Sequence, residues 1–121
     1  MVFLAVFPVI SAHGQTKNLQ GNISFDFKVG NKVFPAGQYK FTPDTIGKYF
    51  TIEGPGNVSG TALVITRVAG EIHTTPNDAH VVFDKVGETY FLAEIWIPGQ
   101  DGFLLHSMRG KHEHRIVNVP L

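Results

Sequence analysis

Several segments of the chain alternate apolar and polar side chains with a period of two, which is typical of half-buried β-strands. Residues 22–29 (NISFDFKV) show the pattern most clearly, because every second side chain is apolar. It recurs over shorter lengths in residues 38–42, 48–53 and 115–119. Residues 61–68 instead contain the continuous apolar run ALVI, which predicts a central strand covered on both faces.

Residues 79–97 (AHVVFDKVGETYFLAEIWI) are the part of the chain richest in aromatic and β-branched residues. Two apolar runs flank a charged link at residues 84–88, which predicts a β-hairpin. We expect the face that carries Phe91 and Ile95 to point into the core. Strict alternation divides the second strand into two faces, Tyr90, Leu92, Glu94 and Trp96 against Phe91, Ala93, Ile95 and Ile97.

Turn signals separate these segments about every 8–12 residues, and no segment has a helical period over more than about two turns. The clearest turns are Gly30-Asn31, Pro35-Ala36-Gly37 and Gly54-Pro55-Gly56-Asn57. The pattern predicts an all-β fold, either a small antiparallel β-barrel or a sandwich of about seven or eight strands. The length suits a single domain, which we place at residues 15–121.

The composition supports a packed domain and excludes several classes of partner and site. Hydrophobic residues make up 43% of the chain and include ten Phe, which is enough to build a core. Ten basic and ten acidic residues cancel, so no net field attracts nucleic acid or an anionic membrane. The absence of cysteine excludes disulfides and Cys-ligated zinc.

Residues 1–14 (MVFLAVFPVISAHG) have features of a secretory signal peptide. An apolar run ends at Ile10, and small residues follow at Ala12 and Gly14, as a signal-peptidase site requires. The run is too short for a transmembrane helix, which needs about 20 apolar residues. The basic n-region is missing, so the segment is either the remnant of a longer leader or a retained strand that completes a sheet. We expect a signal-peptide remnant cleaved near Gln15, and therefore an exported protein, whether periplasmic, at the cell surface or extracellular.

Two motifs resemble a group of short exported bacterial all-β proteins of unknown function. One is residues 25–41 (FDFKVGNKVFPAGQYKF), with a Pro-Ala-Gly-x-Tyr turn. The other is residues 81–99 (VVFDKVGETYFLAEIWIPG), with a Tyr-Phe-Leu-x-Glu-Ile strand. The resemblance implies export and a β fold, and it implies no activity.

Three histidines near the C-terminus are candidate metal ligands. On a strand, His112 and His114 project to the same face, as pairs that bind zinc, copper or nickel do. His106 would add a third nitrogen if residues 107–111 fold back. Two imidazoles alone give a weak site. Nearby basic side chains also oppose a cation: Arg109, Lys111 and Arg115. We therefore predict a solvated polar tail that binds no metal tightly, and no resident cofactor.

No motif typical of an enzyme is present. Residues 56–60 (GNVSG) place serine one position too late for a nucleophile elbow, and there is no Gly-rich phosphate loop. We expect a non-catalytic exported domain that binds a ligand or assembles at the cell surface, where exposed strand edges could self-associate. One alternative is a small barrel carrying an apolar ligand, and another is a metal-binding protein built on the histidines. Candidate residues for the apolar ligand are Tyr39, Tyr90, Trp96 and Glu94.

Overall fold

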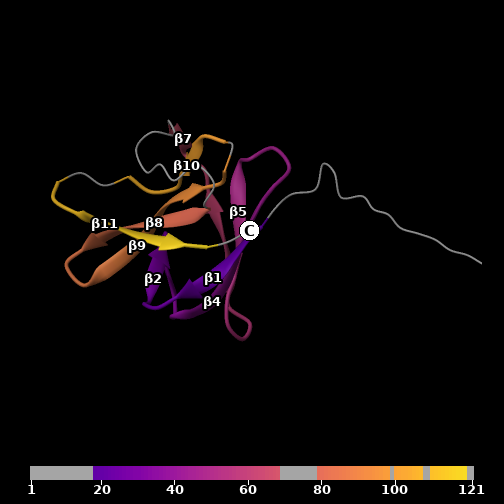
Figure 1. Ribbon diagram of the computed structural model, residues 1–121. Coiled ribbons are helices and arrows are strands. Elements are labelled where there is room, and N and C mark those ends of the chain that lie inside the picture. The colour runs from indigo at the N-terminus through magenta and orange to yellow at the C-terminus, as the bar shows by residue number, and fades with distance from the viewer. Residues whose placement is uncertain (1–17, 69–78, 99, 108–109, 120–121) are drawn as a thin grey trace, which may run out of the picture.

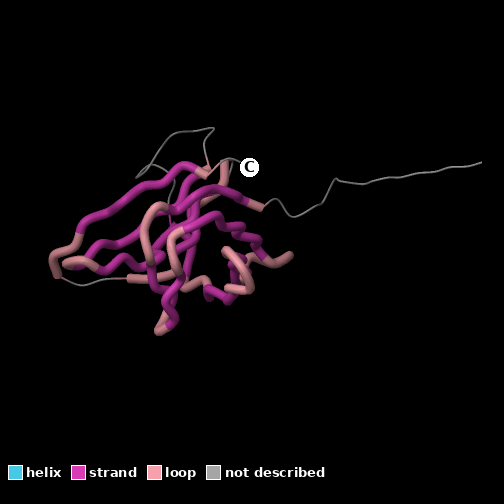
Figure 2. Tube along the Cα trace, turned by 90° about the horizontal axis from the view of Figure 1, so that it is seen from below, coloured by secondary structure: helices cyan, strands magenta, loops and turns pink. Residues whose placement is uncertain are grey.

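The computed structural model describes residues 18–68, 79–98, 100–107 and 110–119, and in them it contains eleven β-strands and no helix (Figures 1 and 2). The described residues therefore contain no helix that is long and apolar enough to cross a membrane. The candidate signal peptide at residues 1–14 lies outside the described residues. The strands are β1 (Leu19–Ile23), β2 (Phe27–Val29), β3 (Lys32–Phe34), β4 (Gly37–Pro43), β5 (Tyr49–Glu53), β6 (Ser59–Leu63), β7 (Thr66–Val68), β8 (His80–Val86), β9 (Thr89–Trp96), β10 (Gly102–Leu104) and β11 (Glu113–Asn118).

The strands form two sheets that are not closed into a barrel, so the predicted all-β fold is a sandwich. One sheet has the order β1-β4-β5-β6. The other has the order β11-β8-β9-β10-β7, and the β2–β3 pair joins it along β9. Every pairing between described strands is antiparallel except the single β2–β9 contact, at Lys28 and Phe91. The long β8–β9 hairpin is the centre of the second sheet (Figure 1).

Aromatic rings from both sheets fill the space between them. Phe27 is 1% exposed and touches three other buried rings, those of Phe34, Tyr39 and Phe83, with centroids 5.0–5.4 Å apart. The Tyr39 hydroxyl donates a hydrogen bond to the carbonyl of Pro35. Burial, and to a lesser extent the negative charge of Asp26, raises the pKa of Tyr39 to about 12.

The predicted hairpin at residues 79–97 is confirmed, but its turn is shorter than expected. Strand β8 continues through Asp84 and Lys85, and only residues 87–88 connect it to β9. Gly87 has a φ of 60°, which suits the first position of a tight two-residue hairpin turn. Ile95 lies in the core as predicted. The consequence is that Asp84, expected in the turn, is instead a strand residue.

A β-bulge in β9 reverses the expected faces of its first half. The register shifts between Val82 and Phe83, so Ala93 is inserted without a direct partner. Leu92 consequently occupies a core position and is 2% exposed. Phe91 lies on the outer face and is only half-buried. The prediction that Phe91 belongs to the core is therefore wrong, because period-two alternation does not survive an inserted residue.

Alanine substitutions at Leu92 and Phe91, which lie on opposite faces of β9, test the bulge. Leu92→Ala should lower the free energy of unfolding by about 2–5 kcal/mol, because it removes a buried side chain and leaves a cavity. Phe91→Ala should cost less, although the side chain removed is larger, since part of the ring is already in water. Urea denaturation of the two variants measures both values. A larger loss of unfolding free energy for Phe91→Ala than for Leu92→Ala would indicate uninterrupted alternation in β9 and contradict the bulge.

The apolar run in residues 61–68 is not a central strand. Of the strands that the structure describes, β6 pairs only with β5, at the edge of its sheet. Ala62 is buried, but Leu63 is 71% exposed and Ile65 is 60% exposed. The prediction of a central strand is wrong because the apolar run spans a crossing between the sheets. Strand β6 ends in one sheet and β7 begins in the other.

The described strands are more numerous than predicted because four of them have three residues each: β2, β3, β7 and β10. The segment predicted as one strand, residues 22–29, is divided between β1 and β2, which belong to different sheets. Between them, an Asp26 carboxylate oxygen accepts the backbone N–H of Ala36 at 2.9 Å. Alternation of apolar side chains continues through such a crossing, because both sheets present a face to the same core.

Candidate metal centre

A buried carboxylate lies on the outer face of the second sheet, away from the aromatic core. Asp84 of β8 pairs with His114 of β11 on one side and with Phe91 of β9 on the other. Directly paired residues project to the same face of a sheet, so these three side chains are neighbours. The Asp84 side chain is only 4% exposed. A carboxylate this deeply buried needs compensating partners.

Three imidazoles supply those partners. His106 Nδ1 lies 3.0 Å from Asp84 Oδ2, and His114 Nε2 lies 3.3 Å from Asp84 Oδ1. His112 Nε2 lies 3.8 Å from the same Oδ1. The three histidines predicted as candidate ligands are thus brought together by the fold, around an acid that the sequence did not indicate.

The start of β11 sets the positions of two of these rings. His112 comes immediately before the strand, and His114 is two residues later, so both project toward Asp84 as strand alternation requires. Their ring centroids are 5.2 Å apart. The sequence-based expectation that the pair shares a face is confirmed. The side chains of His112 and His114 are 23% and 37% exposed, and most side chains of β11 are exposed.

The bulge in β9 sets the position of the third ring. The carbonyl of Ala93 accepts the backbone N–H groups of Leu105 and His106, at 2.7 and 3.3 Å. This contact carries the segment after β10 across the outer face. The imidazole of His106 then stacks on the ring of Phe91, with centroids 4.8 Å apart and planes inclined by 2°.

The tautomer of His112 follows from its second hydrogen bond. His112 Nδ1 lies 3.0 Å from the carbonyl oxygen of Gly110. A carbonyl can only accept, so Nδ1 carries the proton and donates it. In the neutral ring, Nε2 is then an unprotonated acceptor that points at a carboxylate oxygen. Two acceptors 3.8 Å apart need a donor or a cation between them, which is a second proton on His112, a water molecule that donates to both, or a metal ion.

The distances around Asp84 suit a metal ion. Ligand atoms of Asp84, His112 and His114 all lie within 4.8 Å of one another. In tetrahedral zinc sites the metal–nitrogen distance of about 2.0–2.1 Å places neighbouring ligand atoms about 3.3 Å apart. The 3.3 and 3.8 Å separations from Oδ1 therefore need only small side-chain adjustments to close on an ion.

Of the three basic residues expected to oppose a cation, Arg115 projects away from the site. The Arg115 guanidinium lies 5.0 Å from the ring of Phe25, on the core side of β11. Lys111 is exposed, and Arg109 lies outside the described residues. The charge objection raised by the sequence therefore fails for Arg115, because alternate residues of a strand point to opposite faces.

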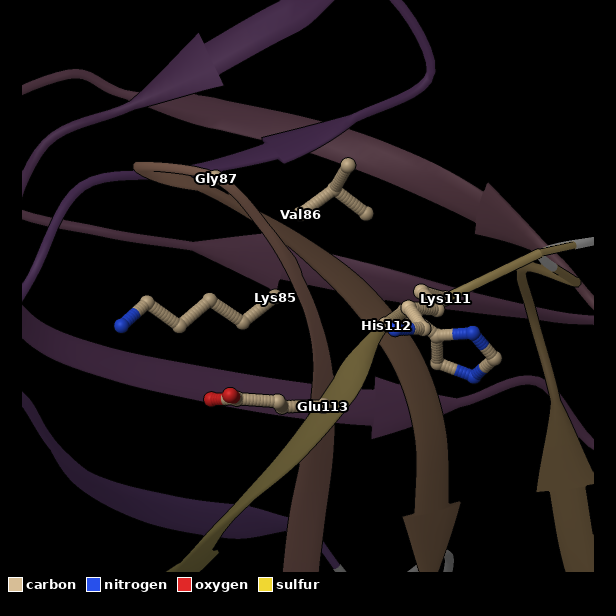
Figure 3. A pocket seen from close by; sticks show the side chains of 6 residues that line it. All are labelled: Lys85, Val86, Gly87, Lys111, His112 and Glu113. Carbon is tan, nitrogen blue, oxygen red and sulfur yellow. The ribbon is translucent and has the colours of Figure 1, made fainter.

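A pocket of about 370 Å³ adjoins the centre between the β8–β9 turn and the start of β11. Figure 3 shows the Lys85 and Glu113 side chains extending to the side opposite the His112 ring. These two residues are directly paired in the sheet. Glu113 is thus a sequence neighbour of both histidines but does not project toward Asp84. The pocket is lined by Lys85, Val86, Gly87, Lys111, His112 and Glu113.

The four residues suggested for an apolar ligand do not gather around one cavity. Tyr39 is in the core, whereas Trp96 lies on the outer face, where it stacks on His80 and donates a 2.8 Å hydrogen bond to Glu94. Tyr90 stacks on Phe25 with centroids 4.0 Å apart. It also lines a pocket of about 180 Å³ that includes none of the other three.

Comparison with known proteins gives no relatives: no family model, curated protein or solved structure matches the chain. The resemblance to short exported bacterial proteins therefore stays a prediction from the two motifs. Function has to be inferred from the geometry of the centre.

Proposed function

We propose that this chain is a non-catalytic exported binding domain whose ligand is a divalent transition-metal ion. Asp84, His112 and His114 are the ligands that we assign to the ion. The observation that carries the proposal is the orientation of His112, whose hydrogen bond to Gly110 leaves Nε2 directed at the buried carboxylate. Metal-binding histidines commonly donate their other ring N–H to a backbone carbonyl in this way.

The ligand chemistry favours zinc, nickel or copper(II) over calcium or magnesium. Two imidazole nitrogens and one carboxylate oxygen are borderline ligands, which suit late first-row metals. Hard cations such as calcium take six to eight oxygen ligands. Three protein ligands also leave one position of a tetrahedral ion for water.

The exported location rests on sequence alone, on the leader-like residues 1–14 and the resemblance described above. It is consistent with a site that contains no sulfur ligand. An imidazole and carboxylate site does not depend on a reducing compartment, since thiol oxidation cannot inactivate it.

Isothermal titration with zinc at about pH 7.5 tests the proposal. We expect one ion per chain, and we expect His112→Ala, His114→Ala and Asp84→Asn each to weaken binding by roughly tenfold or more. Loss of groups that merely orient a ligand already costs 10–100-fold, so loss of a ligand should cost at least as much. Binding should also weaken at lower pH, because the imidazoles must be deprotonated to coordinate.

Glu113→Gln is the matched control, since Glu113 lies between the two histidines in sequence but points to the other side. It should bind zinc like the wild-type domain. Absence of a zinc-binding heat in the wild type, or equal binding by the histidine variants, would contradict the proposal. The centre would then be an imidazolium–carboxylate cluster.

A further inference from the structure

We infer that His106 positions the Asp84 carboxylate for the metal and is not itself a ligand. This inference rests on the proposed function. The two oxygens of Asp84 have different partners: Oδ2 contacts His106, while Oδ1 faces His112 and His114. A carboxylate held at one oxygen in this way presents the other to the ion, as the hydrogen-bonded carboxylate ligands of metal sites do.

The polarity of the contact defines what His106 does. The proton on Nδ1 is donated to Asp84 Oδ2 across 3.0 Å, because an ionised carboxylate can only accept. A protonated nitrogen has no lone pair for a metal, so Nδ1 cannot coordinate while this bond exists. The other ring nitrogen, Nε2, carries its lone pair on the far side of the ring from the Nδ1–H bond, and His106 is not in the group of converging ligand atoms formed by Asp84, His112 and His114. Coordination by His106 of the ion bound at Asp84 Oδ1 would therefore require breaking the bond to Asp84.

Two further contacts hold His106 in the donating position. The Ala93 carbonyl accepts the backbone N–H of His106, and the ring lies parallel to that of Phe91. Both contacts depend on the bulge, which provides the Ala93 carbonyl and turns Phe91 to the outer face. The inserted residue Ala93 therefore helps to fix the position of His106, and through His106 the orientation of the Asp84 carboxylate.

Three substitutions of His106 distinguish a positioning residue from a ligand. The Nδ2 of asparagine is equivalent in chain position to Nδ1 of histidine, whereas the Nε2 of glutamine is one bond further out. His106→Ala should weaken zinc binding by about 10–100-fold, the usual effect of removing a group that orients a ligand. His106→Asn should recover most of the affinity, and His106→Gln should recover little of it.

The ring protonation of His106 provides a second measurement, by nitrogen NMR of the metal-free protein at about pH 7.5. We expect a protonated Nδ1. An unprotonated Nδ1, or equal losses of affinity in His106→Ala and His106→Asn while the wild type binds zinc, would overturn the positioning role alone. A wild type that does not bind zinc would overturn the proposed function, and the positioning role with it.

Discussion

Replacing Phe27 with alanine is expected to lower the free energy of unfolding by about 3–5 kcal/mol. The ring is 1% exposed and belongs to β2 of the second sheet, yet it contacts Tyr39 of the first sheet. Its removal would empty the centre of the aromatic cluster. Neighbouring rings relax only partly into such a space, so the cavity adds to the lost burial of apolar surface.

Urea or thermal denaturation measures this change, and Val33→Ala is the control. Val33 lies on the adjacent strand β3 but is 55% exposed, so its truncation should change stability by no more than about 0.5 kcal/mol. Losses of similar size in the two variants would show that Phe27 is not at the centre of the core.

Zinc at a hundredfold excess over its Kd should stabilise the domain by about 2.7 kcal/mol, because it binds the folded state and not the unfolded one. For a domain of this size, taking about 4 °C for each kcal/mol, the melting temperature should rise by roughly 10 °C. The sequence alone predicted that no metal binds tightly. The expectation differs because the fold adds the buried Asp84 to His112 and His114.

Two variants make the thermal experiment specific to the centre. His114→Ala should abolish most of the zinc-dependent rise, since this ring is 3.3 Å from Asp84 Oδ1. Glu113→Gln should keep it. A rise of the same size in His114→Ala would place the stabilising ion elsewhere on the protein.

Sequence patterns predicted the class of the fold and the central hairpin, because period-two alternation and a Gly-containing link are local signals. They did not predict the bulge. An inserted residue depends on how a neighbouring segment is anchored, and here the anchor is the contact of Ala93 with residues 105–106. They also did not separate an edge strand from a central one in residues 61–68, since an apolar run has the same appearance in both.

The candidate site was predicted in part, for a similar reason. His112 and His114 were placed on one face by simple alternation, which does not depend on the rest of the fold. Asp84 was missed because its charge made residues 84–88 resemble a turn. The signal that could have identified Asp84 is the Gly87-Glu88 pair. Interpreted as a two-residue hairpin turn, this pair extends β8 through Asp84, and strand alternation then places the Asp84 side chain on one face of the sheet. That His106 also reaches Asp84 depends on the path of the chain after β10, which no local pattern contains.

The edge position of β11 gives the metal proposal a consequence for dynamics. Among the described strands, β11 pairs with β8 alone. Most of its side chains are exposed, so it is among the elements most prone to local opening. An ion bound by Asp84 on one strand and by His112 and His114 on the other would cross-link the start of β11 to the sheet. Fraying from that end would then require release of the ion. The concentration of free metal would thus set how often this edge of the sheet becomes open to hydrogen exchange or to pairing with another chain.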